Sequence, residues 1–189
     1  MIKEYYIKNM VCNRCIKVVR NELLDEKVEV LEVILGKVVI ETNDEYKDKE
    51  KILKVLNENG FVLLDNPATI ISERIKIELI SLFNVVPMVL PGKLSEYLVE
   101  KTNMDYSKIS KVFSSTENIT IEKYFIKLKI EKVKELIQSN EYNFTEIGQL
   151  LDYNNVNYLS RQFKSETGMS LTQYKGLNTN FRNSLDQIM

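Results

Sequence analysis

The chain has 189 residues, of which 44% are hydrophobic and 28% charged, with 6 Gly and 3 Pro. This composition is typical of a globular protein with one large or two small domains. The formal net charge is −1, and neither side of Pro67 carries the basic excess of a strongly electrostatic nucleic-acid binder. The sequence contains no histidine, which excludes imidazole bases and histidine metal ligands. It also offers no Gly-rich phosphate loop and no convincing carboxylate pair, so we expect no enzyme.

Targeting signals are absent from the sequence. No apolar run reaches the roughly 18 residues of a membrane-spanning helix, and the N-terminus lacks the apolar core of a signal peptide. We therefore expect a cytoplasmic protein without a membrane partner. In that reducing compartment a structural disulfide is not expected. Any metal site must depend mostly on the two cysteines, Cys12 and Cys15.

The first 66 residues alternate between strand and helix patterns. They predict a strand at 3–8, a helix at 12–25, strands at 28–35 and 37–42, a helix at 44–58 and a short strand at 61–64. The order βαββαβ is that of the split βαβ unit. We therefore expect an α+β, ferredoxin-like domain over residues 1–66.

After Pro67 the strand pattern stops and helical periodicity continues to the end, interrupted by two prolines at 85–92. Helices are expected near 70–84, 94–101, 105–115, 120–139, 144–151, 155–166 and 170–175. We therefore predict an all-α domain at 67–189. The junction at 66–69 is too short for a free tether, so each domain is expected to sense the orientation of the other.

The cysteines lie between the first strand and the first helix. Two thiolates at the spacing of Cys12 and Cys15 can bind one soft ion, because soft ions prefer thiolate over oxygen. A tetrahedral zinc site needs four ligands, whereas a two-coordinate ion such as Cu(I), silver or mercury fits two sulfurs. A silent pair and a thioredoxin-like redox pair are the alternatives.

In this fold context, Met10, Cys12 and Cys15 resemble the Met-x-Cys-x-x-Cys loop of the heavy-metal-associated domain of copper chaperones and metal-transporting ATPases. The resemblance covers about residues 1–65. It implies that Cys12 and Cys15 are the metal ligands and that Met10 packs beneath the loop without binding metal. It also places Phe61 beside the site.

Two segments of the helical half repeat one design. Each has a short helix, a tight turn and a second helix with two apolar residues four positions apart: Ile109 and Phe113 within 94–115, and Leu159 and Phe163 within 144–166. This is helix-turn-helix geometry, in which the second helix enters a DNA major groove. Asp105 and Asn155 are the expected N-caps of these second helices.

A long helix at 120–139 separates the two segments. Its 20 residues span about 30 Å at 1.5 Å per residue. Successive major-groove faces on one side of B-DNA lie about 34 Å apart. We therefore expect that one chain can contact two consecutive groove segments.

Residues 155–170, followed by Tyr174 and Lys175, resemble the signature end of the AraC/XylS-type regulator domain. The resemblance covers about 70–176. It implies a DNA-binding transcription regulator with two helix-turn-helix units, the second at about 143–176. The positions that match the groove-facing residues of the family are Ser107, Lys108 and Lys111 in the first unit, and Asn157, Ser160, Arg161 and Gln162 in the second.

The chemistry of these side chains agrees with DNA contact. Arg161 can pair bidentately with guanine, and Asn157 or Gln162 with adenine. Lysines at 108, 111 and 164 suit phosphates, which orient a protein on DNA without specifying sequence. The alternative interpretation is that they are the ordinary solvated faces of amphipathic helices. Four aromatic residues are expected to be core or packing residues and not to stack on bases: Tyr153, Tyr158, Phe163 and Tyr174.

Three positions depart from the AraC/XylS pattern. Asp152-Tyr153 replaces Gly-Phe before the second recognition helix, and Glu117-Asn118 replaces Thr-Gly after the first. Val99 stands where a small residue normally lets two helices cross closely. The fold is expected to survive these departures, whereas the DNA affinity stays open, more so for the first helix-turn-helix unit.

The sequence thus predicts a sequence-specific transcription regulator with a soft-metal input domain and a DNA-binding output domain. Double-stranded DNA and Cu(I) are the expected ligands, and a homodimer and a metal-donor protein are candidate partners. Two alternatives stay open. One is a constitutive DNA-binding regulator whose N-terminal domain serves only protein contacts. The other is a metallochaperone whose helical half docks onto a partner.

Overall fold

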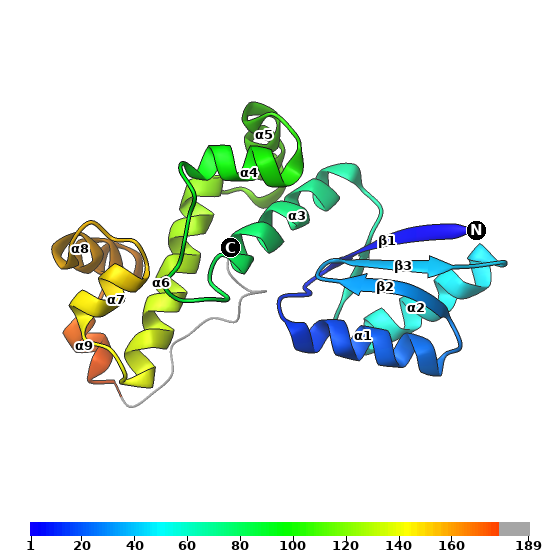
Figure 1. The fold of residues 1–189 in the computed structure, drawn as a ribbon, viewed down its shortest axis with the longest axis horizontal. Coiled ribbons are helices and arrows are strands. Elements are labelled where there is room, and N and C mark those ends of the chain that lie inside the picture. The colour runs from blue at the N-terminus through cyan, green and yellow to red at the C-terminus, as the bar shows by residue number, and fades with distance from the viewer. Residues whose placement is uncertain (178–189) are drawn as a thin grey trace. The chain divides into compact units, whose positions relative to one another are not determined.

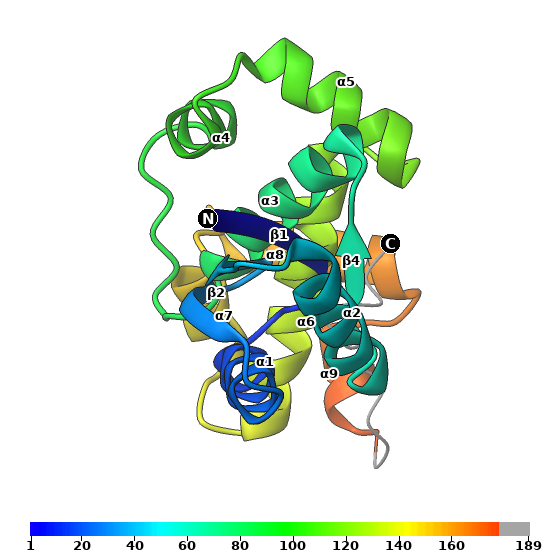
Figure 2. The same cartoon turned by 90° about the vertical axis from the view of Figure 1, so that its right-hand side faces the viewer.

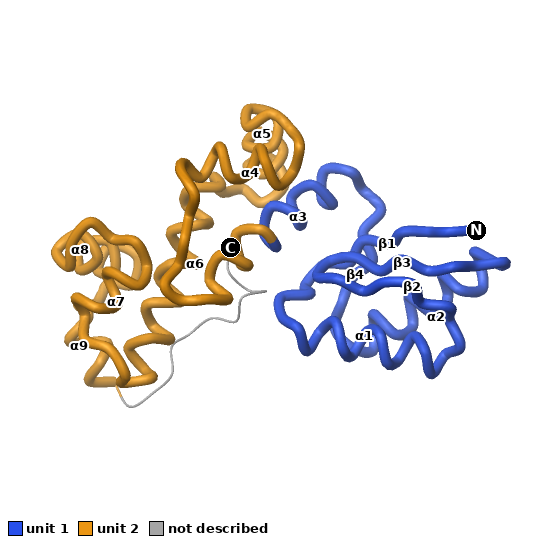
Figure 3. The backbone as a smooth tube through the Cα atoms, viewed as in Figure 1, with its two compact units in different colours: residues 1–77 blue, residues 78–189 orange. Residues whose placement is uncertain are grey.

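The computed structural model describes residues 1–177. Residues 178–189, the end of the predicted C-terminal domain, lie outside the described part. The chain divides into two compact units, residues 1–77 and residues 78–189 (Figure 3). This division falls inside helix α3 (Pro67–Ser81), so one continuous helix runs from the first unit into the second. None of the described helices is long and apolar enough to cross a membrane.

The first unit is a small α/β arrangement with a four-stranded antiparallel sheet. Its elements are β1 (Ile2–Lys8), α1 (Asn13–Asp25), β2 (Glu29–Ile34), β3 (Lys37–Glu41), α2 (Glu45–Glu58) and β4 (Val62–Leu64), followed by the first turns of α3. The strand order is β2-β3-β1-β4, and all three neighbouring pairs are antiparallel. Each predicted strand and helix of this unit is present, with ends that differ by at most one residue.

Alternation along β1 explains how the sheet forms a core. Tyr5 and Ile7 are buried, whereas Glu4 is exposed, because successive strand residues point to opposite faces. The helices α1 and α2 lie against the same face of the sheet (Figure 1, Figure 2). The core between sheet and helices contains fully buried residues from every layer: Ile7, Val38, Ile40, Val19, Leu23, Ile52 and Leu56.

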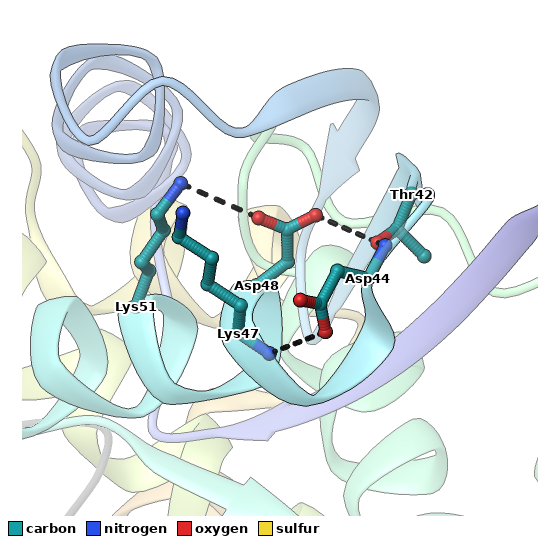
Figure 4. Close-up of polar contacts among 5 residues, drawn as sticks. All are labelled: Thr42, Asp44, Lys47, Asp48 and Lys51. Atoms are coloured by element: carbon teal, nitrogen blue, oxygen red, sulfur yellow. Dashed lines mark hydrogen bonds and ion pairs between the residues drawn. The ribbon is translucent and has the colours of Figure 1, made fainter.

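Polar side chains define the beginning of α2 (Figure 4). The Asp44 carboxylate accepts a hydrogen bond from the Lys47 backbone N–H at 3.1 Å, which satisfies one of the N–H groups that a helix start leaves free. The Asp48 carboxylate accepts from the Thr42 hydroxyl at 2.6 Å and pairs with Lys51 Nζ at 3.4 Å. These contacts join the end of β3 to the first turn of α2.

The second unit is helical in its described part. After the last turn of α3 it contains α4 (Leu94–Thr102), α5 (Tyr106–Glu117), α6 (Ile121–Ser139), α7 (Phe144–Leu150), α8 (Val156–Thr167) and α9 (Leu171–Lys175). Every helix that the sequence predicts here is found, and α3 begins and ends three residues earlier than expected.

Helix α6 is the central element of this unit. Its 19 residues span about 28 Å, close to the predicted length. The helices α4 and α5 lie beside one end of α6, and α7, α8 and α9 lie beside the other (Figure 1). Ten of its residues are buried, among them Tyr124, Leu128 and Val133. The long helix is therefore a packed spine between the two predicted helix-turn-helix units.

Candidate nucleic-acid interface

The second helix-turn-helix unit is fixed by caps at both of its helices. The Asn143 side chain accepts from the backbone N–H groups of Thr145 and Glu146, and the Glu146 carboxylate accepts in return from the Asn143 N–H at 2.7 Å. This reciprocal capping box begins α7. The recognition helix α8 begins where the Asn155 side chain accepts from the Tyr158 N–H at 2.9 Å, which confirms the predicted N-cap.

The turn between α7 and α8 keeps its shape without the usual glycine. Asp152 adopts a left-handed backbone with φ of 55°, a conformation that Asp tolerates better than most residues. The next N–H, that of Tyr153, then donates to the Gly148 carbonyl at 2.9 Å. The departure at Asp152-Tyr153 therefore leaves the local fold intact.

The predicted N-cap of the first recognition helix is confirmed in its position, but its side chain forms no capping hydrogen bond. Asp105 occupies the N-cap position of α5, but among the described residues its carboxylate accepts no bond from the first turn. The φ of Asp105 is −59°, whereas that of Asn155 is −163°, so the two side chains leave the backbone in different directions. The first turn of α5 is joined to α6 instead, because the Tyr106 hydroxyl donates to the Glu122 carboxylate.

The two helix-turn-helix units, α4–α5 and α7–α8, repeat each other at an offset of fifty residues. In each recognition helix two apolar residues are fully buried, Ile109 and Phe113 in α5 and Leu159 and Phe163 in α8. Both phenylalanines pack on a tyrosine of the following helix, with ring centroids 5.6 Å apart for Phe113–Tyr124 and 5.4 Å apart for Phe163–Tyr174. The repeat continues through a left-handed helix end (Asn118, Gly168) and an N-cap hydroxyl (Thr120, Ser170).

The two other departures from the AraC/XylS pattern lie in the first helix-turn-helix unit, and the local structure accommodates both. Asn118 takes the left-handed conformation that Gly168 takes after α8, and its N–H donates to the Ser114 carbonyl at 3.1 Å. Val99 is 38% exposed, whereas the buried residues of α4 are Tyr97, Leu98 and Thr102. The expected crowding at a helix crossing therefore does not fall on the Val99 side chain.

On α5, the three predicted groove-facing residues share one exposed face. Ser107, Lys108 and Lys111 are all exposed, opposite the buried Ile109 and Phe113. Residues three and four positions apart are neighbours on a helix, so these side chains form one continuous polar stripe. These three residues bring two positive charges and no negative charge to the stripe.

On α8, the structure separates the predicted residues into two groups. Asn157, Arg161 and Lys164 are exposed. Arg161 Nε donates to the Asn157 carbonyl at 3.4 Å, which holds the guanidinium near the beginning of the helix. Ser160 and Gln162 are half-buried, and Gln162 Oε1 accepts from a tyrosine hydroxyl at 2.8 Å. The Gln162 carbonyl therefore has a structural partner that the sequence did not indicate.

That partner is Tyr153, whose burial raises the pKa of its hydroxyl. Tyr153, Phe163 and Tyr174 are buried as predicted. Tyr158 packs without being a core residue: its ring lies 6.1 Å from that of Tyr153, centroid to centroid, and it is 49% exposed on the outward face of α8. Its position, fifty residues after Lys108, is the signal that could have identified it as a further residue of the interface.

Gly148 provides a test of the packing in the second unit. A methyl group at this position would lie 3.8 Å from Leu159 and 3.9 Å from Tyr153, which is ordinary van der Waals contact. Because glycine inside a helix is less stable than alanine by about 1 kcal/mol, we expect Gly148→Ala to raise the free energy of unfolding by about that amount. Urea unfolding followed by circular dichroism measures it.

Gly168→Ala is the matched control, since Gly168 has φ of 75° and alanine is strained there. We expect this variant to be less stable than the wild type by about 1 kcal/mol. A destabilising Gly148→Ala would show that α7 and α8 pack more closely than described.

The cysteine pair lies in the N-terminal compact unit, residues 1–77, at the beginning of α1. Cys12 is the N-cap residue and is exposed, and the Cys15 N–H donates to the Cys12 carbonyl at 3.0 Å. The two sulfurs lie 3.6 Å apart. Burial raises the pKa of the Cys12 thiol, but hydrogen bonds from Cys15 and Arg14 outweigh it and lower that pKa overall. Met10 is fully buried, as the resemblance implies.

The geometry of the pair fits one soft ion. With metal–sulfur bonds of about 2.3 Å, sulfurs up to about 4.6 Å apart can share an ion. Among residues 1–177 there is no group of three or more His, Cys, Asp or Glu side chains that could hold a metal. The described residues therefore support two sulfur ligands and give no support to a four-ligand zinc site.

Comparison with known proteins gives the following matches. Residues 98–176 match the family described as "Helix-turn-helix domain". No curated protein matches the chain. The C-terminal domain of AraT, a response regulator from Geobacillus stearothermophilus, is 21% identical with a TM-score of 0.45, over 62% of this chain and 93% of its own. A DNA-binding transcriptional dual regulator from Escherichia coli K-12 is 14% identical with a TM-score of 0.47, over 56% of this chain and 88% of its own.

The family match covers α5 to α9 and all but the beginning of α4, and thus both recognition helices. It includes every residue that the sequence predicts to contact DNA. Residues 98–176 are therefore similar to a helix-turn-helix domain, a motif whose second helix enters a DNA major groove.

Proposed function

We propose that this protein is a sequence-specific transcription regulator whose DNA binding responds to a soft metal ion held by Cys12 and Cys15. The observation that carries the DNA-binding part is the pair of recognition helices, α5 and α8, each with a buried apolar face and an exposed polar face. Helix α6 lies between these two recognition helices in the sequence and acts as a spacer. Its length of about 28 Å suits two consecutive major grooves on an adjusted or bent duplex.

We further propose that residues 1–66 form a ferredoxin-like domain related to heavy-metal-associated domains. The element order βαββαβ and the strand order β2-β3-β1-β4 support this assignment. The placement of Cys12 and Cys15 at the beginning of α1, together with the burial of Met10, agrees with it. Cu(I) is the ion that we expect at the pair, because two thiolates satisfy a two-coordinate soft ion.

The residues around the pair favour ion binding. The backbone N–H groups at the beginning of α1 lower the pKa of Cys12, and the thiolate is the form that binds metal. Arg14 adds a positive charge beside the two sulfurs. A bound soft ion would tie the two sulfurs together and displace their protons. Such binding alters DNA affinity only if the ion prefers one of two arrangements of the chain.

A Cu(I) titration of the full-length protein on a duplex selected from a random pool tests this proposal. We expect one ion per chain and a change in the dissociation constant for DNA of about fivefold or more, the lower range of allosteric coupling. The Cys12→Ser/Cys15→Ser variant should bind the same duplex with no response to Cu(I). An unchanged dissociation constant in the wild type would contradict metal control and favour a constitutive regulator.

A further inference from the structure

The fifty-residue repeat allows the outward faces of the two recognition helices to be compared position by position. Buried residues, ring contacts and helix ends coincide between α5 and α8. Equivalent outward positions therefore lie on helices of the same length that both end in a residue with a left-handed backbone. Three outward positions of α5 are then equivalent to three of α8: Ser107 to Asn157, Lys108 to Tyr158, and Lys111 to Arg161.

The chemistry differs at all three pairs. The α5 face carries two lysines, Lys108 and Lys111, whose ammonium groups are point charges that suit phosphate oxygens. The α8 face carries Asn157 and Arg161, whose planar groups can form two parallel hydrogen bonds with adenine and guanine edges. The exposed ring of Tyr158 adds an apolar surface of the kind that contacts a thymine methyl group.

The position of the α8 side chains strengthens the contrast. Asn157 is in the first turn of α8, and the residues near the beginning of a recognition helix are those that reach base edges. The hydrogen bond from Arg161 Nε to the Asn157 carbonyl directs the guanidinium toward the same end. The α5 face has only Ser107, a short hydroxyl with little power to discriminate bases, at the position of Asn157.

We infer that the two units divide DNA recognition between them: α8 reads base sequence and α5 binds the phosphate backbone of the neighbouring groove segment. This inference rests on the proposed DNA-binding function. It predicts a target site with one specified segment, recognised by Asn157, Tyr158 and Arg161. The adjacent segment, about one helical turn away, tolerates any sequence.

Selection of duplexes from a random pool by the full-length protein tests the inference. We expect the enriched duplexes to share one conserved segment and to vary freely one helical turn from it. Two equally conserved segments, one turn apart, would overturn the division of labour. Recovery of no duplex at low salt would overturn the proposed function itself, so the two failures are distinguishable.

Single variants assign the segments to the helices. Arg161→Ala and Asn157→Ala should weaken binding to the selected duplex by about 5- to 150-fold each and leave binding to a scrambled duplex nearly unchanged. Lys108→Ala and Lys111→Ala should weaken both duplexes equally and reduce the slope of log affinity against log salt by about one each. The reverse pattern, with sequence preference lost in the lysine variants, would contradict the inference.

Discussion

Replacing Phe163 with alanine is expected to lower the free energy of unfolding of the helical unit by about 3–5 kcal/mol. The Phe163 side chain is fully buried and stands edge-on to the Tyr174 ring, with centroids 5.4 Å apart. Its loss leaves a cavity between α8 and α9 that the surrounding helices fill only in part. Urea unfolding of the full-length protein, followed by circular dichroism at a helical wavelength, measures the change.

Ser165→Ala is the control on the same helix, since Ser165 is exposed and its substitution should change stability by about 0.5 kcal/mol or less. The equivalent core position in the first unit, Phe113, is also fully buried and should give a loss of similar size. A Phe163→Ala protein as stable as the Ser165→Ala protein would show that α8 does not pack as described.

Removal of the Lys134 ammonium is the second change with a large expected effect. Lys134 Nζ lies 2.7 Å from Glu131 Oε1, and both side chains are more than 90% buried in α6. Lys134→Met keeps the length of the side chain and leaves the buried carboxylate without this cation. Because removing one partner of a buried ion pair is strongly destabilising, we expect a loss of about 3–5 kcal/mol in the same unfolding measurement.

A second ion pair of the same helix supplies a matched control. Lys132 and Glu135 form a pair of equal spacing, 2.6 Å apart, with side chains 16% and 40% exposed. Lys132→Met should cost about 1 kcal/mol or less, because solvent compensates the partly exposed carboxylate. The double variant Glu131→Met/Lys134→Met should be more stable than Lys134→Met, since it removes both buried charges. Equal losses for Lys132→Met and Lys134→Met would contradict the importance of burial.

The sequence predicts the helices and strands well where periodicity is strong. The apolar residues of α5 and α8 recur four positions apart, so both the helices and their buried faces follow from spacing. The helix ends are predicted less closely: α5 continues to Glu117 and α8 to Thr167, two residues and one residue beyond the expected ends. Each helix stops at a residue that tolerates a left-handed backbone, Asn118 or Gly168. The two sulfurs lie close together because helical spacing places Cys15 one turn after Cys12.

Contacts between elements were harder to predict than the elements themselves. Periodicity indicates that Gln162 is near the edge of a face, but only the packed turn shows that Tyr153 binds its carbonyl. Tyr158 was expected to pack because aromatic residues usually do; its ring packs on Tyr153, but residue type does not reveal that it stays 49% exposed. Asp105 is the N-cap residue but forms no capping bond, because such a bond depends on a backbone angle that residue type does not determine. The division inside α3 likewise reflects tertiary contacts that a proline in the sequence does not reveal.

The most direct test of the account is the affinity of the full-length protein for duplex DNA over a series of salt concentrations. We predict that log affinity falls linearly with log salt, and that Lys111→Ala/Arg161→Ala, which alters one exposed residue of each recognition helix, binds at least tenfold more weakly. Wild-type protein that binds no duplex at low salt, or a double variant that binds as tightly as wild type, would contradict the assignment of α5 and α8 as the DNA-binding faces.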